Sequence, residues 1–176
     1  MGRLTKSRWI SLALALGVAA IAVPSLGVEP VNPFAQRLLD AHNRERADAG
    51  VPPLEWSDKL AREAREWADT IALEGRMRHA DRATRGTSGE NIWMGTAGRF
   101  SAEDMIDTFT RERRYYRHRA FPDISTTGRW QDVGHYTQVV WRNTQQVGCA
   151  VAQNGEDDFL VCRYWPAGNW EGEIAF

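Results

Sequence analysis

The sequence predicts an α+β domain in which helices pack on a small antiparallel sheet. Three segments with helical spacing of apolar residues occupy the first two thirds of the chain, and a β-hairpin pattern lies in the last third. Helices that precede strands along the chain are typical of this class. The length of 176 residues and the hydrophobic content of 43% fit one globular domain.

Residues 1–27 are predicted to be a cleaved signal peptide. Three basic residues precede an apolar run over residues 10–23, and small residues precede a cut after Gly27. The basic residues are Arg3, Lys6 and Arg8. The alternative is an uncleaved membrane anchor, but the run of about 14 residues is shorter than the roughly 20 that span a bilayer. We therefore expect a mature domain, 28–176, with no stable transmembrane anchor. It would be secreted to the extracellular space, or to the periplasm if the source is bacterial.

The mature domain is expected to be mildly acidic. Removal of residues 1–27 takes three cations from the 22 Lys and Arg, which leaves 19 against 23 Asp and Glu and a net charge of −4. An acidic domain without a basic stripe lacks the electrostatic footprint of a nucleic-acid-binding protein. We expect no nucleic-acid partner.

The first helix is predicted to begin at Asn32 or Pro33 and to continue to about Ala49. Gly50 ends it, and the proline pair 52–53 prevents a restart. Its expected inward stripe is Phe34, Leu38, Leu39 and Ala41.

Two further helices are predicted from their caps. Ser57 caps the second, which ends at Gly75, and Ser101 with Asp104 three residues later forms a capping box for the third. The stripe of the second is Leu60, Ala64, Trp67, Ala68 and Ile71, and that of the third is Met105, Phe109 and Tyr116. The glycine- and arginine-rich segment between them, through Gly86, Gly89 and Gly95, predicts a loop.

The last third predicts a hairpin that carries a disulfide. Residues 136–141 fit either a strand or a short buried helix. Segments 147–153 and 159–164 read as strands around the turn 154–158, and this register sets Cys149 opposite Cys162. An oxidising compartment favours a bond between these cysteines, and two free buried thiols are the alternative.

Four segments carry a family resemblance. In order along the chain they are His42-Asn43 followed by Arg46, GENI at residues 89–92, GHYTQVVWRNT at residues 134–144 and FLVCRYWPAGN at residues 159–169. Together they resemble the CAP superfamily, which includes cysteine-rich secretory proteins, insect venom antigens and plant pathogenesis-related proteins. The resemblance implies a CAP-type α-β-α sandwich, with helices flanking a small antiparallel sheet.

The resemblance also implies a cleft that holds two histidines and two glutamates. Carried over by position, these are His42 in the first helix, Glu90, Glu112 in the third helix, and His135, with His42 and His135 as a metal-binding pair. The cation would be zinc or another divalent ion. The spacing places His42 on the apolar side of its helix. An inward histidine is also compatible with a core residue whose hydrogen bonds are satisfied.

The resemblance favours a secreted binding module for a sterol, a fatty acid, another lipid or an extracellular partner. The alternatives are a metal-dependent hydrolase that uses the same cleft and a non-catalytic scaffold. The sequence shows no activated nucleophile beside a histidine and its orienting acid, and Ala80 follows His79 where many relatives have serine. We therefore expect no efficient peptidase activity.

Overall fold

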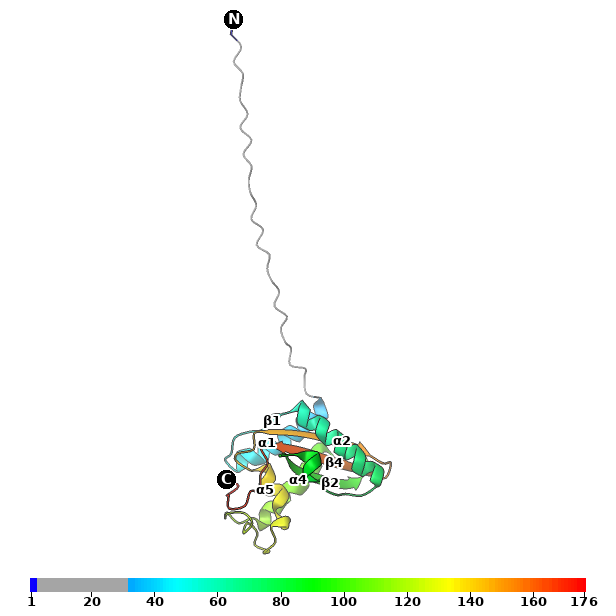
Figure 1. Cartoon of the computed structure of the whole chain (residues 1–176), viewed down its shortest axis with the longest axis vertical. Coiled ribbons are helices and arrows are strands. Elements are labelled where there is room, and N and C mark those ends of the chain that lie inside the picture. The colour runs from blue at the N-terminus through cyan, green and yellow to red at the C-terminus, as the bar shows by residue number, and fades with distance from the viewer. Residues whose placement is uncertain (3–31) are drawn as a thin grey trace. The chain divides into compact units, whose positions relative to one another are not determined.

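The computed structural model describes residues 1–2 and 32–176 (Figure 1). The predicted signal peptide, apart from those first two residues, and its cleavage point lie outside the described residues. Residues 32–176 form one compact domain. Among the described residues, no helix combines the length and the apolar character needed to cross a bilayer.

The long helices begin at the residues that the sequence indicates, and the first two also end there to within one residue. Helix α1 covers Pro33–Asp48, α2 covers Asp58–Glu74 and α4 covers Ala102–Thr110. The side chains of Asn32, Ser57 and Ser101 accept hydrogen bonds from first-turn N–H groups, and Asp104 completes the predicted capping box. Gly75 ends α2 in the left-handed conformation, with φ of 62°.

The sheet has four strands in the order β1-β3-β4-β2. They are β1 (Glu55–Trp56), β2 (Gly89–Thr96), β3 (Gln146–Gln153) and β4 (Asp157–Trp165). The β3–β4 pairing has the predicted register, and a disulfide joins Cys149 to Cys162. Strand β1 pairs parallel to β3, so the sheet is mixed rather than purely antiparallel.

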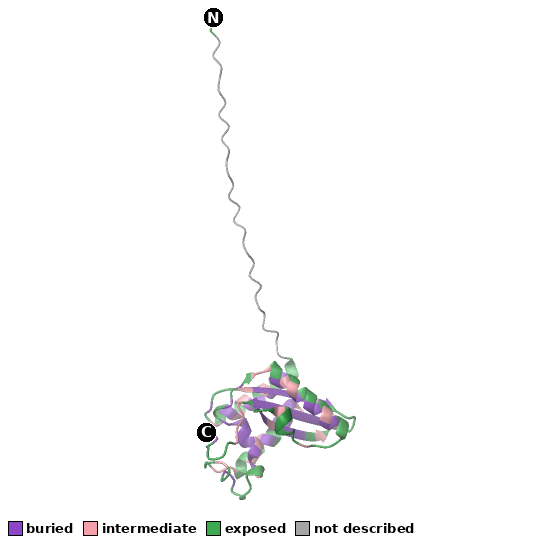
Figure 2. Cartoon of the chain, in the orientation of Figure 1, coloured by how far each residue is buried: buried purple, intermediate pink, exposed green. Residues whose placement is uncertain are grey.

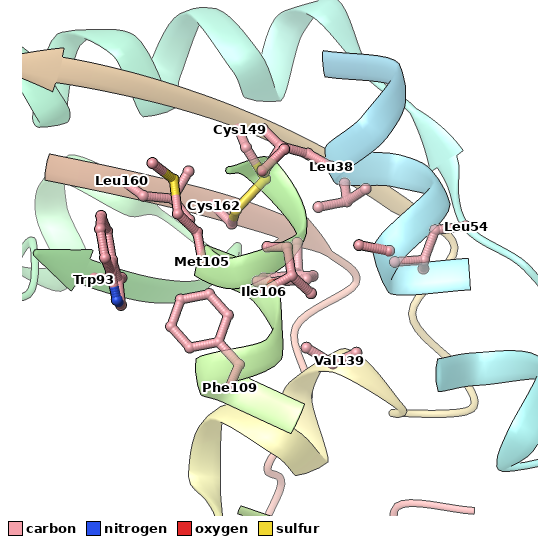
Figure 3. Packing of buried hydrophobic residues seen from close by; sticks show 14 of the residues in the cluster. Leu38, Leu54, Trp93, Met105, Ile106, Phe109, Val139, Cys149, Leu160 and Cys162 are labelled. Atoms are coloured by element: carbon pink, nitrogen blue, oxygen red, sulfur yellow. A yellow bond between two sulfur atoms is a disulfide. The ribbon is translucent and has the colours of Figure 1, made fainter. Parts of the chain in front are cut away.

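The sheet separates two helical layers. Helix α2 packs on one face, where it meets alternate residues of the strands such as Ile92 and Val161. Helices α1, α4 and α5 (Gly134–Val139) cover the other face, which presents Leu160 and the disulfide (Figure 3). The strands are therefore mostly buried on both sides (Figure 2). This arrangement is the predicted α-β-α sandwich.

Three predictions about local structure require correction. The expected loop through Gly89 and Gly95 is strand β2, because it pairs with β4 along its whole length. The third helix ends at Thr110 and continues as a 3₁₀ helix, η1 (Arg111–Tyr115), so Glu112 lies in η1 rather than in the helix. Phe34 is 37% exposed, because it lies at the edge of the inward stripe of α1.

The segment that the sequence left open between a strand and a helix is helical. Residues 136–139 of it belong to α5, which is buried on all but one of its six positions, and residues 140–141 follow the end of that helix. Two short elements complete the described fold: helix α3 (Arg82–Arg85) and the 3₁₀ helix η2 (Trp130–Asp132). Both contribute residues to the lining of a cleft at the β2 edge of the sheet.

Candidate functional site

A cleft of about 620 Å³ lies along the first residues of β2. Its lining comes from residues 79–91, from Phe121, and from two further segments distant in sequence, 130–138 and 167–171. Glu90 projects toward the face covered by α2, whereas α5 contributes from the opposite helical layer. The cleft therefore collects side chains from both sides of the sheet at the β2 edge.

The first ionisable pair in the cleft is His79 with Glu90. The Nδ1 atom of His79 lies 2.7 Å from Oε1 of Glu90, and the same oxygen accepts the Ala80 N–H at 3.0 Å. The Glu90 side chain is 1% exposed, and its other oxygen lies 3.2 Å from the guanidinium of Arg163, which is equally buried. A lone buried carboxylate is costly, so Arg163 supplies the charge that allows Glu90 to sit there. Burial lowers the pKa of Arg163, and Glu90 opposes that shift.

The second pair joins His135 of the cleft lining to Glu112, a predicted cleft residue that is not itself part of the lining. The Nδ1 atom of His135 lies 2.7 Å from Oε1 of Glu112, and Oε2 accepts the backbone N–H groups of His135 and Tyr136 at 3.0 and 3.1 Å. These N–H groups belong to the first turn of α5, which has no cap from its own N-terminal residue. Glu112 therefore caps α5 from η1 and orients the His135 ring at the same time. The ring also stacks on Phe109, with centroids 5.0 Å apart.

Both pairs leave the same nitrogen free. A carboxylate oxygen beside Nδ1 accepts a hydrogen bond from the Nδ1–H group, so the neutral ring carries its hydrogen on Nδ1 and a lone pair on Nε2. Among the residues that the structure describes, neither Nε2 of His79 nor Nε2 of His135 has a hydrogen-bond partner. Both imidazoles line one cleft, so two acceptor nitrogens are available there to a ligand or a cation.

The structure places His42 outside this cleft, which corrects the predicted histidine pair. His42 is fully buried, donates from Nδ1 to the Leu38 carbonyl and accepts at Nε2 from the Tyr164 hydroxyl, both at 2.8 Å. Burial lowers the pKa of His42 to about 4. Its neighbours are the two sulfur atoms of the disulfide. His42 is thus a core histidine with satisfied hydrogen bonds. His79, rather than His42, is the second histidine of the cleft.

Hydrogen bonds fix the walls of the cleft. Asn91 donates to the His135 carbonyl at 3.1 Å and to the Tyr164 hydroxyl at 3.2 Å. Gln138 accepts the Gly168 N–H at 2.9 Å, and any Cβ at Gly89 would lie 2.1 Å from the same Gln138 oxygen. A side chain at position 89 would therefore displace the cleft wall.

Sequence analysis missed three groups of lining residues. One is His79. Its position just after the second helix, eleven residues before Glu90, is the feature of the sequence that could have indicated a place in the cleft. The second is the arginine pair Arg82 and Arg85 on α3. The third is an aromatic group, Phe121, Trp130 and Trp170. The last two groups lie in loops or in helices of three or four residues, which are too short for a periodicity that shows which side chains face inward.

An α-β-α sandwich with two histidine–glutamate pairs at one sheet edge defines a class of small domain built around a polar cleft. The chain matches the model of the cysteine-rich secretory protein family, CAP, over residues 39–164. This match covers more than half of the chain, so the protein belongs to the CAP family.

Relatives and solved structures agree with this assignment. The chain is 40% identical to pathogenesis-related protein 1A of Nicotiana tabacum over 142 residues, which are 80% of each chain. It is 30% identical to the human Golgi-associated plant pathogenesis-related protein 1 over 86% of this chain and 94% of the relative. The crystal structure of NaASP2 with Zn²⁺ is similar in fold, with a TM-score of 0.70 at 22% identity, over 86% of this chain and 90% of NaASP2.

Proposed function

We propose that this protein is a secreted binding module whose cleft holds a divalent cation, zinc foremost, through His79 and His135. One observation carries the proposal: two imidazoles in one cleft each have Nδ1 occupied by a glutamate and Nε2 free. Carboxylates that hold the other nitrogen of a histidine ligand fix its tautomer and raise its basicity. Glu90 and Glu112 are placed for this role.

The two histidine nitrogens fit a cation that keeps coordination positions open for water or a ligand. Imidazole nitrogen is a preferred zinc ligand, but catalytic zinc sites usually have three protein ligands. Among the described residues, the one group of three ligand-type atoms within 4.8 Å of one another is His42, Cys149 and Cys162, whose sulfurs are consumed by the disulfide. The cleft thus offers two nitrogens, and further positions would go to water or to a bound ligand. The cation would supply positive charge for an anionic group of that ligand.

The hydrolase alternative has less support from the geometry. A general base must reach a water, yet Glu90 is 1% exposed and already accepts from His79 and Ala80. Glu112 accepts three hydrogen bonds from His135 and the start of α5. Both carboxylates are committed to orienting histidines, which favours binding over catalysis. Similarity in fold to NaASP2, which was solved with Zn²⁺, supports the choice of cation.

Calorimetric zinc titration of protein purified without chelators tests the proposal. We expect the variants His79→Ala and His135→Ala each to bind zinc at least about tenfold more weakly than the wild type, because each loses one of two ligands. His118→Ala is the matched control, since His118 is exposed and lies outside the cleft lining. Equal affinity in all four proteins would show that the cleft holds no cation.

A further inference from the structure

We propose that the same cleft binds an acidic carbohydrate, a sugar ring that carries a carboxylate. This inference extends the proposed function by naming the ligand class, and it does not depend on the cation. It rests on three properties of the lining: fixed aromatic faces, hydrogen-bonding side chains in place of aliphatic ones, and arginines without a carboxylate partner.

Two tryptophan rings stand exposed in the lining and are held in place. Trp130 is 39% exposed and Trp170 is 44% exposed. Trp130 packs against Phe121 with ring centroids 5.2 Å apart, and a Cβ at Gly134 would lie only 3.1 Å from it. Trp170 donates from its indole N–H to the Ala167 carbonyl at 2.8 Å. Large rings with fixed orientation in a concave site offer flat apolar faces on which a ring-shaped ligand can stack.

The rest of the lining is polar. Apart from the three aromatic residues, its largest apolar side chain is that of Ala167. Six side chains carry amides or hydroxyls: Thr87, Ser88, Asn91, Gln131, Gln138 and Asn169. In the described part of the chain, Thr87 and Gln131 have no hydrogen-bond partner for these groups. An acyl chain or a sterol would leave such groups without partners, whereas the hydroxyls of a sugar satisfy them. The predicted lipid ligand would therefore need a different site.

The arginines give the ligand its charge. Within residues 32–176, no carboxylate lies within 4.0 Å of Arg82 or Arg85. The Arg85 guanidinium is held by the backbone carbonyls of Ala80 and Ser88, at 3.3 and 3.0 Å. Arginine presents a planar fork that matches a carboxylate. Of the two lining glutamates, Glu90 is committed to His79 and Arg163. The arginines of α3 therefore offer the positive charge for a carboxylate of the ligand.

The test is calorimetric titration with trigalacturonate, and with galactotriose as the neutral trimer, in chelator and again in excess zinc. We expect trigalacturonate to bind in chelator and the neutral trimer to bind at least about fivefold more weakly. Trp170→Ala should lose about tenfold in affinity, because one stacked ring is removed. Arg82→Gln should lose about fivefold at low ionic strength.

Matched controls separate the cleft from the general surface. Trp165→Ala removes an equally exposed ring, 45% exposed, outside the lining, and Arg62→Gln removes an exposed arginine on α2. Both should bind as the wild type does, and thermal unfolding should show every variant folded. Equal binding of the neutral trimer, no binding of trigalacturonate at millimolar concentration, or unchanged affinity in Trp170→Ala would each overturn the proposal. Binding in chelator by a protein that takes up no zinc would sustain it while refuting the cation proposal.

Discussion

Replacement of Arg163 by methionine should destabilise the domain strongly. The change keeps an unbranched side chain but leaves Glu90, 1% exposed, without the guanidinium that lies 3.2 Å from its Oε2 atom. Removal of one partner from a buried ion pair costs about 3–5 kcal/mol, because the remaining charge is uncompensated. Arg163 is equally buried, so solvent screens the pair little. We expect the free energy of unfolding, measured with urea, to fall by about that amount.

The double variant Glu90→Gln with Arg163→Met separates loss of the pair from loss of packing. With no charge left to compensate, it should be less destabilised than the sum of the two single variants by about 1–3 kcal/mol. Arg62→Met is the control on exposed α2 surface and should change stability by less than about 0.5 kcal/mol. Additive effects in the double-mutant cycle would refute the argument that Arg163 compensates the buried charge of Glu90.

Three further predictions concern the core and the N-terminus. His42 has a folded pKa of about 4, below the unfolded value of about 6.5, so the unfolded state binds more protons between these values. Stability should fall by about 3 kcal/mol as pH drops from 6.5 to 4, and a His42→Gln variant with the same pH dependence would contradict this. Replacement of both Cys149 and Cys162 by alanine should cost on the order of 3 kcal/mol in chemical unfolding, and two alkylatable thiols in the exported wild type would argue against the bond. Intact-mass analysis of exported protein should give an N-terminus at Val28, and retention of residues 1–27 would indicate an anchor.

Features that depend on neighbours in sequence could be predicted. Ser57, Ser101 and Gly75 mark helix ends because capping involves residues only a few positions apart. The register that pairs Cys149 with Cys162 follows from a short turn, since hairpin partners are equidistant from its centre. The sandwich itself followed from the family resemblance, and the structure confirms it.

Features that depend on distant partners could not be predicted. Strand β2 has the glycines of a loop, and its pairing with β4, about 70 positions away, decides its conformation. His42 and His79 both fit a cleft ligand by type. The fold decides between them, because α1 packs His42 against Tyr164 while the end of α2 brings His79 to Glu90. Arg163 reads as part of a buried strand, and its role appears only when β2 sets Glu90 opposite it.

The most direct test of the central claim is long-range ¹H–¹⁵N NMR of histidine-labelled protein during a zinc titration. The chain has four histidines, so every ring can be assigned to a site. We predict that His79 and His135 carry hydrogen on Nδ1 before zinc is added and that zinc shifts the Nε2 resonances of these two rings alone. Acidification should reverse the shifts, because protonated imidazole cannot bind metal. Zinc shifts at His42 or His118, or unmoved Nε2 resonances at both cleft histidines, would contradict the claim.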